Sequence, residues 1–418
     1  MMRLRLQRIW RFLALFISAE KIWRWPRRSE VLIFNASGQE ILLEYLRPWT
    51  PEVLHVEGEL VNIPVLLASL FKRGGIFDAY VDSYIGRVQP RLIVTIIDND
   101  LRFYTISARR KNIKTLFIQN GVRVYFSEVF ETLDRALAPS ESLEVDYMAV
   151  FGARIGAEYA RYIQGDVIPI GSIKSNRYPI RNTRKSRTIA FVSQYRNTDG
   201  IMMDEKFYTR QEFLEKADRL VLAFLAKYAR KHGKELFVVP CSGSRKYVTL
   251  EGEKSYYCEL LGQPFYFSEW RWPGSSYEAI DSAEVVVCVD STLGYESVAR
   301  GNKTAILSIR SHLIGLRGLT YGWPESYPDC GPFWTNLPDP DVFEGILDHL
   351  FAINDEQWRA ELTDCGFASV MAYDAGNSIL KSILEKELGP PPISGIKHHA
   401  AGGQAASSGI RDQPGNLS

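Results

Sequence analysis

The chain has 418 residues, more than one hydrophobic core usually supports, so we expect two domains. A net charge of +1 argues against a protein that is basic throughout, and therefore against general coating of nucleic acid. The five cysteines are odd in number and form no Cys-x-x-Cys pair. They indicate neither a disulfide framework nor a zinc site, and they fit a cytosolic protein.

Residues 1–28 form a basic amphipathic segment at the start of the chain. Residues 1–30 hold eight Arg or Lys against two Glu, interleaved with Trp, Phe, Leu and Ile. The apolar stretch Phe12–Ile17 is too short to span a bilayer, and no small-residue cleavage site of a signal peptide follows before Trp23. We expect an interfacial helix on the anionic inner face of the cytoplasmic membrane. A helix packed on the protein's own second domain is the alternative.

Residues 29–173 alternate strands and helices in the manner of a doubly wound domain. We expect strands at Val31–Phe34, Val53–Val56, Leu92–Ile97, Lys114–Gln119, Tyr147–Phe151 and Val167–Ile170, and helices at Gln39–Leu46, Val61–Phe71, Leu101–Arg110 and Ala153–Ile163. This alternation predicts a parallel sheet, whose ligands collect at the carboxyl ends of the strands. The residues expected on that rim are Ser37, Gly38, Asp98, Asp100, Asn120, Gly121 and Gly152.

The alternation of strands and helices resumes after a basic, turn-rich stretch, residues 174–187. We interpret this stretch as an interdomain linker. A second domain over residues 188–388 is expected to contain strands at Thr188–Ser193, Glu235–Pro240, Val285–Val289 and Lys303–Ile309, a long helix at Arg210–His232, and helical regions at Asp341–Gly366 and Val370–Leu388. Gly318–Pro340 is rich in Gly, Pro and aromatic residues and is expected to wrap over the sheet. Residues 389–418 lack the apolar content to order themselves.

The stretch Val285–Gly301 is the most informative segment. An apolar β-branched run ends at Asp290, and Ser291, Thr292 and Gly294 then supply capping oxygens and open backbone at the start of a helix. Free N–H groups at such a start bind phosphate, and Glu296 one turn later could accept hydrogen bonds from ribose hydroxyls. The alternative is an ordinary capped strand-helix turn, which every parallel α/β domain contains.

This segment resembles the C-terminal half-domain of bacterial surface-carbohydrate (lipopolysaccharide and capsule) biosynthesis proteins with the two-domain GT-B glycosyltransferase fold. A second match is Phe117–Arg123, where related polymerases often carry a histidine and this chain has Asn120. A third is the glycine turn Ile170–Lys174. The resemblance implies an α/β protein with two Rossmann-like doubly wound domains facing a cleft, and a last helix that crosses back to the first domain.

The resemblance also implies an activity, a glycosyltransferase that takes a nucleotide-sugar donor and a glycan or lipid-linked glycan acceptor, with no further cofactor. A metal-free site of this type stabilises the leaving phosphate with helix N-termini and cationic side chains, for which Arg196, Lys174 and Arg245 are candidates. Asp98 or Asp100 could act as base toward the acceptor, or cap the following helix instead. Asn120 and Arg123 would lie opposite the phosphate and hold the acceptor or a sugar carboxylate.

Two other classes of function share this architecture. A nucleotide-sugar 2-epimerase would use carboxylates and a histidine in the cleft, and the shortage of histidines at the expected rims argues against it. A non-catalytic scaffold that holds an enzyme at the membrane would bind no nucleotide. Nucleotide binding and turnover of a UDP-sugar without acceptor distinguish the three.

Overall fold

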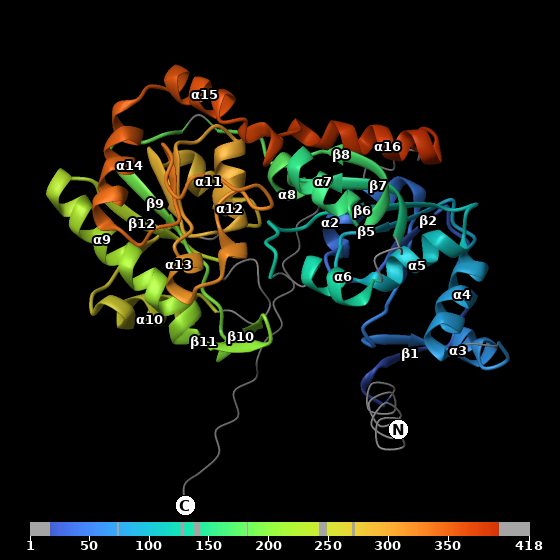
Figure 1. The fold of residues 1–418 in the computed structure, drawn as a ribbon. Helices are drawn as coiled ribbons and strands as arrows, with labels where there is room; N and C mark the ends of the chain where they lie inside the picture. Colours follow the sequence, from blue (N-terminus) through green and yellow to red (C-terminus); the bar gives the residue numbers. More distant parts are fainter. Residues whose placement is uncertain are drawn as a thin grey trace, which may run out of the picture.

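The computed structural model describes residues 17–72, 75–126, 129–137, 143–181, 183–241, 249–269 and 272–392. Two α/β domains lie beside each other, the first on the right and the second on the left in Figure 1. Most of the predicted N-terminal helix, the candidate Arg245 and the tail beyond residue 392 lie outside the described residues. Among the helices that the structure does describe, none combines the length and apolar character needed to cross a bilayer.

The first domain is built on a six-stranded parallel sheet in the order β3-β2-β5-β6-β7-β8. Its strands are β2 (Val31–Phe34), β3 (Glu52–Leu54), β5 (Leu92–Thr95), β6 (Lys114–Ile118), β7 (Leu143–Val150) and β8 (Ile163–Pro169). Its main helices are α2 (Gln39–Leu46), α4 (Ile76–Val88), α5 (Leu101–Arg109), α6 (Phe130–Ala136) and α7 (Ala153–Ala160). The predicted alternation is confirmed, although α4 and α6 were not predicted.

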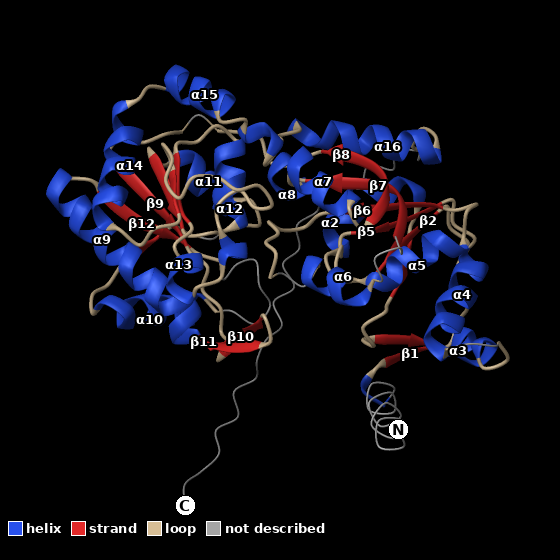
Figure 2. Ribbon diagram, in the orientation of Figure 1, coloured by secondary structure: helices blue, strands red, loops and turns tan. Residues whose placement is uncertain are grey.

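Helices cover both faces of this sheet, because alternate residues of its strands are buried on opposite sides. Leu32 and Phe34 of β2 face a core built with α4, α5 and α7, whereas Val31 and Ile33 face a second core built with α2 and the last helix. Figure 2 shows the strands enclosed between these helical layers. The all-apolar strand sequence is therefore the signature of a sheet buried on both faces.

The N-terminal part of the first domain departs from the prediction. Residues Glu20–Ile22 form strand β1, which pairs in parallel with β4 (Leu60–Asn62) in a separate two-stranded sheet. The helix expected over residues 1–28 therefore does not extend through Glu20–Ile22, and this segment packs on the first domain rather than the second. Helix α3 (Ile63–Ser69) follows β4 and starts two residues later than predicted, because Asn62 caps it by accepting from the Val65 N–H at 3.2 Å.

The second domain contains a six-stranded parallel sheet in the order β13-β12-β9-β14-β15-β16. Its strands are β9 (Thr188–Val192), β12 (Glu235–Val239), β13 (Tyr266–Phe267), β14 (Val285–Cys288), β15 (Thr304–Leu307) and β16 (Trp334–Thr335). Numbered along the domain this order is 3-2-1-4-5-6, the arrangement of dinucleotide-binding Rossmann folds. Gly318–Pro340 does not simply wrap over the sheet, because it supplies the edge strand β16.

Helices cover both faces of the second sheet as well, and a hairpin extends from it. The helices are α9 (Lys216–His232), preceded by a π-helical turn (Gln211–Glu215), then α10 (Leu250–Leu261), α11 (Ser275–Ser282), α12 (Thr292–Ala299), α13 (Arg310–Ile314), α14 (Pro340–Ala352) and α15 (Asp355–Asp364). The hairpin joins β10 (Gly200–Met203) to β11 (Lys206–Thr209). Neither this hairpin nor α10 was predicted.

Two segments connect the domains. The stretch interpreted as a linker starts with a short helix, α8 (Ile173–Asn176), which ends against the first domain. Further on, residues 367–377 return across Gly152 and Gly171, where an added Cβ would lie 2.3 Å from the Ser369 carbonyl and 2.1 Å from the Ala372 carbonyl. The last helix, α16 (Ser378–Leu388), then packs on the first domain, as predicted (Figure 1).

Candidate functional site

The second sheet has one topological switch point, between its central strands β9 and β14. From there the chain winds outward in opposite directions, so the loops after the two strands part and leave a crevice at their carboxyl ends. Gln194 and Arg196 follow β9, and Asp290 and Ser291 follow β14. The strand order thus places the segment singled out in the sequence where open α/β sheets bind ligands.

Helix α12 begins at this crevice with unused hydrogen-bonding capacity. Ser291 occupies the N-cap position in an extended conformation, yet its side chain makes no capping hydrogen bond. Helix geometry leaves the first N–H groups, those of Thr292 and Leu293, without intrahelical acceptors. Together with the positive end of the helix dipole, these groups suit a phosphate oxygen.

Gly294 brings α12 close to the sheet. A Cβ added at Gly294 would lie 2.0 Å from Cys288 Sγ and 2.9 Å from Cys288 Cβ, so only glycine permits the observed packing of α12 on β14. Cys288 is fully buried, and burial raises the pKa of its thiol. The structure therefore explains this glycine by packing, which positions the helix start at the crevice.

An arginine that the sequence analysis missed holds the two sides of the crevice together. Arg310, only 2 % exposed, donates to Asp290 after β14 and to Gln194 Oε1 after β9, the latter at 2.5 Å. It also pairs with the buried Asp218 at 3.4 Å, and burial raises the pKa of Asp218 to about 6. No local spacing signals this network, because Arg310 lies 92 residues from Asp218 along the chain.

Glu296, proposed from the sequence as a ribose ligand, lies at the seam between the domains. It is 3 % exposed, and its two carboxylate oxygens accept from the Ser172 hydroxyl and, at 3.1 Å, from the Tyr277 hydroxyl. Burial raises the pKa of Glu296, and the Ser172 hydrogen bond opposes that rise. A ribose contact would have to replace one of these protein donors, and this role stays a prediction.

Arg300 fixes the start of the linker to the second domain. Its side chain is fully buried and forms a two-pronged ion pair with Asp281, at 2.9 and 2.5 Å. It also donates to the carbonyls of Ser175 and Tyr178 at 3.1 and 2.9 Å. The residues joining the two domains are therefore held in one arrangement by a buried charge.

On the first domain, the two candidate carboxylates have different partners. Asp98 is 1 % exposed and accepts from Arg123 Nε at 2.9 Å and from the Tyr159 hydroxyl. Burial raises the pKa of Tyr159 well above its ordinary value, which keeps this hydroxyl a donor. Asp100 is the N-cap of α5 and accepts from the Arg102 N–H at 3.1 Å, so the capping interpretation is confirmed for Asp100.

Asn120 and Arg123 lie together beside this pair. Asn120 donates through Nδ2 to the Ile96 carbonyl at 2.8 Å and accepts through Oδ1 from Arg123 Nη2 at 2.9 Å. The Arg123 side chain, 14 % exposed, is the charged group that reaches the interdomain cleft. The rim of the first domain thus presents a guanidinium whose orientation is set by a buried carboxylate and an amide.

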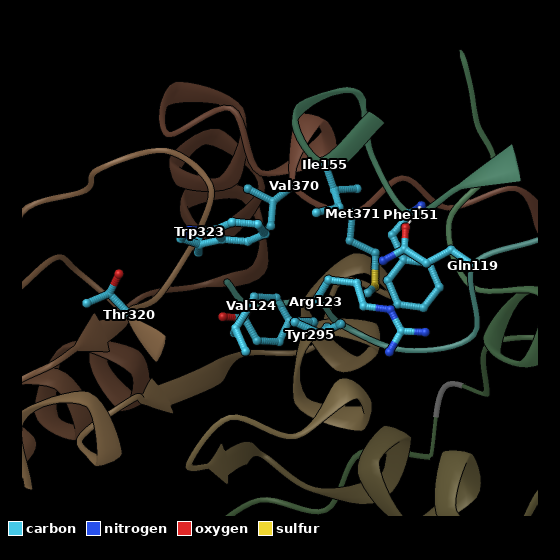
Figure 3. A pocket seen from close by; sticks show the side chains of 12 residues that line it. Gln119, Arg123, Val124, Phe151, Ile155, Tyr295, Thr320, Trp323, Val370 and Met371 are labelled. Atoms are coloured by element: carbon cyan, nitrogen blue, oxygen red, sulfur yellow. Dashed lines mark hydrogen bonds between the residues drawn. The ribbon is translucent and has the colours of Figure 1, made fainter. Parts of the chain in front are cut away.

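The two rims meet around a small cavity of about 30 Å³. Figure 3 shows Gln119, Arg123 and Phe151 of the first domain converging on it with Tyr295 and Trp323 of the second. At its edge the Val122 N–H donates to Thr292 Oγ1 at 3.1 Å, which joins the first domain directly to the start of α12.

The remaining cationic candidates lie around the same region. Lys174 is exposed on α8, and its charge opposes the rise in the pKa of Glu296 that burial causes. Arg196 is half-buried in the loop after β9, at the switch point. Lys174 therefore lies at the junction of the domains, and Arg196 lies on the second domain's side of the cleft.

Residues 116–388 match the sequence model of a family described as "putative O-antigen biosynthesis protein". Among solved structures, a glycosyltransferase from Rickettsia africae is 10 % identical over 86 % of this chain and 99 % of its own, with a TM-score of 0.47. A variant of the wall teichoic acid polymerase TagF is 11 % identical over 86 % and 89 %, with a TM-score of 0.44.

A UDP-GlcNAc 2-epimerase from Methanocaldococcus jannaschii is 8 % identical over 84 % of this chain and 98 % of its own, with a TM-score of 0.43. No curated protein sequence matches the chain. The family match covers well over half of the chain, whereas the structural similarities are distant. The assignment of two Rossmann-like domains in a GT-B arrangement therefore rests on the strand orders, the cleft and the returning helix α16.

Proposed function

Because the chain belongs to this family of O-antigen biosynthesis proteins, we propose that it is a glycosyltransferase that takes a nucleotide-activated sugar. The observation that carries the proposal is the start of α12 at the switch point of a 3-2-1-4-5-6 sheet. Its free N–H groups and the unused Ser291 hydroxyl face a second rim that carries Arg123.

In this proposal the donor diphosphate binds at Ser291, Thr292 and the backbone around Gly294. The positive end of α12 and the cations Arg196 and Lys174 stabilise the negative charge that grows on the phosphate as the glycosidic bond breaks. These groups serve in place of a divalent ion, so the reaction needs no metal. Arg123 and Asn120, across the cleft, hold the acceptor or a carboxylate of the sugar.

Binding a donor requires the domains to separate. Pockets for ligands of nucleotide size occupy several hundred Å³, whereas the cavity between the rims measures about 30 Å³. The hydrogen bond from Val122 to Thr292 spans the position proposed for the phosphate and would break on opening. Donor binding therefore replaces a contact between the domains, and closure over the donor brings Arg123 toward it.

An inverting transfer also needs a base to deprotonate the acceptor hydroxyl. Of the two carboxylates predicted for this role, Asp98 is the one joined to the cleft, through Arg123. It could take a proton only after Arg123 moves toward a bound substrate. Asp100, engaged as a helix cap and with Arg102, is the weaker candidate.

We place the enzyme at the inner face of the cytoplasmic membrane, where a lipid-linked glycan acceptor would be found. Residues 1–28 carry a net charge of +7, and each basic residue near an anionic surface contributes about 1 kcal/mol to binding. This is enough for reversible, salt-sensitive attachment.

A thermal-shift screen of nucleoside mono- and diphosphates against the purified protein tests the proposal, and it also identifies the donor class. A stabilising nucleotide, followed by transfer from its sugar derivative to an acceptor, supports a transferase. Conversion of the sugar nucleotide without any acceptor would show an epimerase instead. Absence of binding to every nucleotide would indicate a non-catalytic scaffold.

A further inference from the structure

Large exposed apolar side chains gather on one part of the first domain. Twelve such side chains occur among the described residues, and seven of them come from residues 17–76. These seven are Ile17, Trp23, Trp25, Leu67, Leu70, Phe71 and Ile76. Phe71 is 90 % exposed and Trp23 is 75 % exposed. A cluster of large apolar side chains exposed to this extent indicates a surface that contacts something other than water.

The fold brings the exposed residues near β1 together with those of α3 and the turn after it. Trp23 directly follows β1, and Leu67, Leu70 and Phe71 belong to α3 and the turn after it, which directly follows β4, the partner strand of β1. The Asn62 side chain fixes the two segments by donating to the Arg24 carbonyl at 2.8 Å. We call the surface formed by residues 17–25, 67–72, 75 and 76 the apolar ledge.

The β10–β11 hairpin of the second domain presents a second apolar pair. Met202 and Phe207 are directly paired across the hairpin and are 60 % and 52 % exposed. The neighbouring residues Met203 and Tyr208 point the other way and are buried with Leu316. The outward face of a hairpin of this kind is ordinarily polar, so its apolar pair indicates a surface that is covered.

The ledge and the hairpin lie at the same edge of the molecule. In Figure 1, β1, α3 and the β10–β11 hairpin are all at the lower edge, while α15 and α16 are at the upper edge. A single flat surface could therefore contact both domains. A bilayer is flat on this scale, whereas a protein partner would have to bridge two separate domains.

The charged residues around the apolar ledge indicate the kind of surface that it binds. Arg24, Arg28 and Lys72 are exposed beside the apolar side chains. The sixteen residues that precede the ledge add four Arg and no acidic residue. Exposed aromatic and aliphatic side chains bordered by Arg and Lys are the chemistry that binds an anionic lipid headgroup layer.

We propose that the apolar ledge and the Met202–Phe207 pair together form a membrane-docking surface that holds both domains against an anionic bilayer. The inference rests on the proposed location of the enzyme and adds that the folded domains, not residues 1–16 alone, contact lipid. Contact through both domains sets the orientation of the cleft relative to the membrane. Because each domain would touch the bilayer, separation of the domains would also change the contact with the membrane.

The test measures binding of the full-length protein to vesicles of phosphatidylethanolamine and phosphatidylglycerol by cosedimentation. The ledge variant carries Leu70→Ser and Phe71→Ser, and the hairpin variant carries Met202→Ser and Phe207→Ser. Removing these side chains from the lipid should weaken binding by about tenfold in each variant. The control Ile379→Ser changes an apolar residue on α16, at the opposite edge, and should bind like the parent.

Undiminished binding of both variants would overturn the proposal, because residues 1–16 would then suffice. A dimer that either variant dissociates, measured by light scattering without lipid, would also overturn it and assign the surface to a second copy of the chain. Nucleotide binding in solution separates this result from a failure of the proposed function. All variants should bind nucleotide and unfold at the same temperature as the parent.

Discussion

The rims of the two domains differ in whether their polar groups already form hydrogen bonds within the protein. On the first domain, Asp98 is buried and accepts from Arg123 and Tyr159, and Asp100 caps a helix. On the second domain, Ser291 makes no capping bond and the start of α12 keeps unused N–H groups. The first rim is therefore built to hold Arg123 in place, and the second to receive a ligand.

The largest expected effect comes from removing the buried carboxylate of the first rim. Asp98→Ala leaves the Arg123 guanidinium and the Tyr159 hydroxyl buried without their acceptor, and should lower the free energy of unfolding by about 3–5 kcal/mol. Asp100→Ala, which removes a cap and a partly exposed ion pair with Arg102, should cost about 1 kcal/mol. Urea unfolding measures both. Equal losses would mean that the two carboxylates are equivalent.

The second expected effect is a pH dependence near the crevice of the second domain. Burial raises the pKa of Asp218 from 3.8 to about 6, so between these values the folded protein holds a proton that the unfolded chain has released. The free energy of unfolding therefore falls as the pH rises through this window, by about 3 kcal/mol from this group.

Asp218→Asn should lack this component. The difference between parent and variant in urea unfolding, measured from pH 4 to pH 7, isolates it from the other titrating groups. Parallel curves for the two proteins would show that Asp218 titrates normally.

A smaller effect is expected at the seam. Glu296→Ala removes the acceptor of the Ser172 and Tyr277 hydroxyls, and should lower the free energy of unfolding by about 1–3 kcal/mol. If Glu296 also contacts ribose, the folded variant should bind nucleotide about tenfold to a hundredfold more weakly. Unchanged nucleotide affinity in calorimetry would remove Glu296 from the binding site and leave it a seam residue.

Ser291→Ala should have the smallest effect on stability and a clear effect on nucleotide binding. Ser291→Ala removes a hydroxyl that makes no capping bond, so the free energy of unfolding should change by less than about 0.5 kcal/mol. Loss of a hydrogen bond to a charged phosphate should weaken nucleotide binding by about tenfold or more. A variant that binds as tightly as the parent would place the phosphate elsewhere.

The local patterns of the sequence predicted much of the fold. The strands β2, β5, β9 and β14 were predicted because buried β-branched runs end at polar turns. Helix α4 was missed, since its aromatic and β-branched residues have weak helix propensity and its packing on the sheet stabilises it. Strands β13 and β16 have two residues each, too few for any periodicity.

The candidate site was predicted only where its residues are neighbours in the sequence. Ser291, Thr292 and Gly294 share one strand-helix turn, and the structure places that turn at the switch point. Arg310 was missed because its partners come from three separate parts of the chain. The burial of Glu296 depends on Ser172, which lies 124 residues away, and no local pattern reports such a contact.

The central claim is that the start of α12 binds the phosphates of a nucleotide without a metal. Calorimetric titration of the parent with the nucleoside diphosphate found by screening, in EDTA, tests it most directly. The account predicts binding in EDTA that added magnesium or manganese does not strengthen, and that Ser291→Ala weakens while Asp100→Ala does not. Binding that appears only when a divalent ion is restored, or that is indifferent to Ser291, would contradict it.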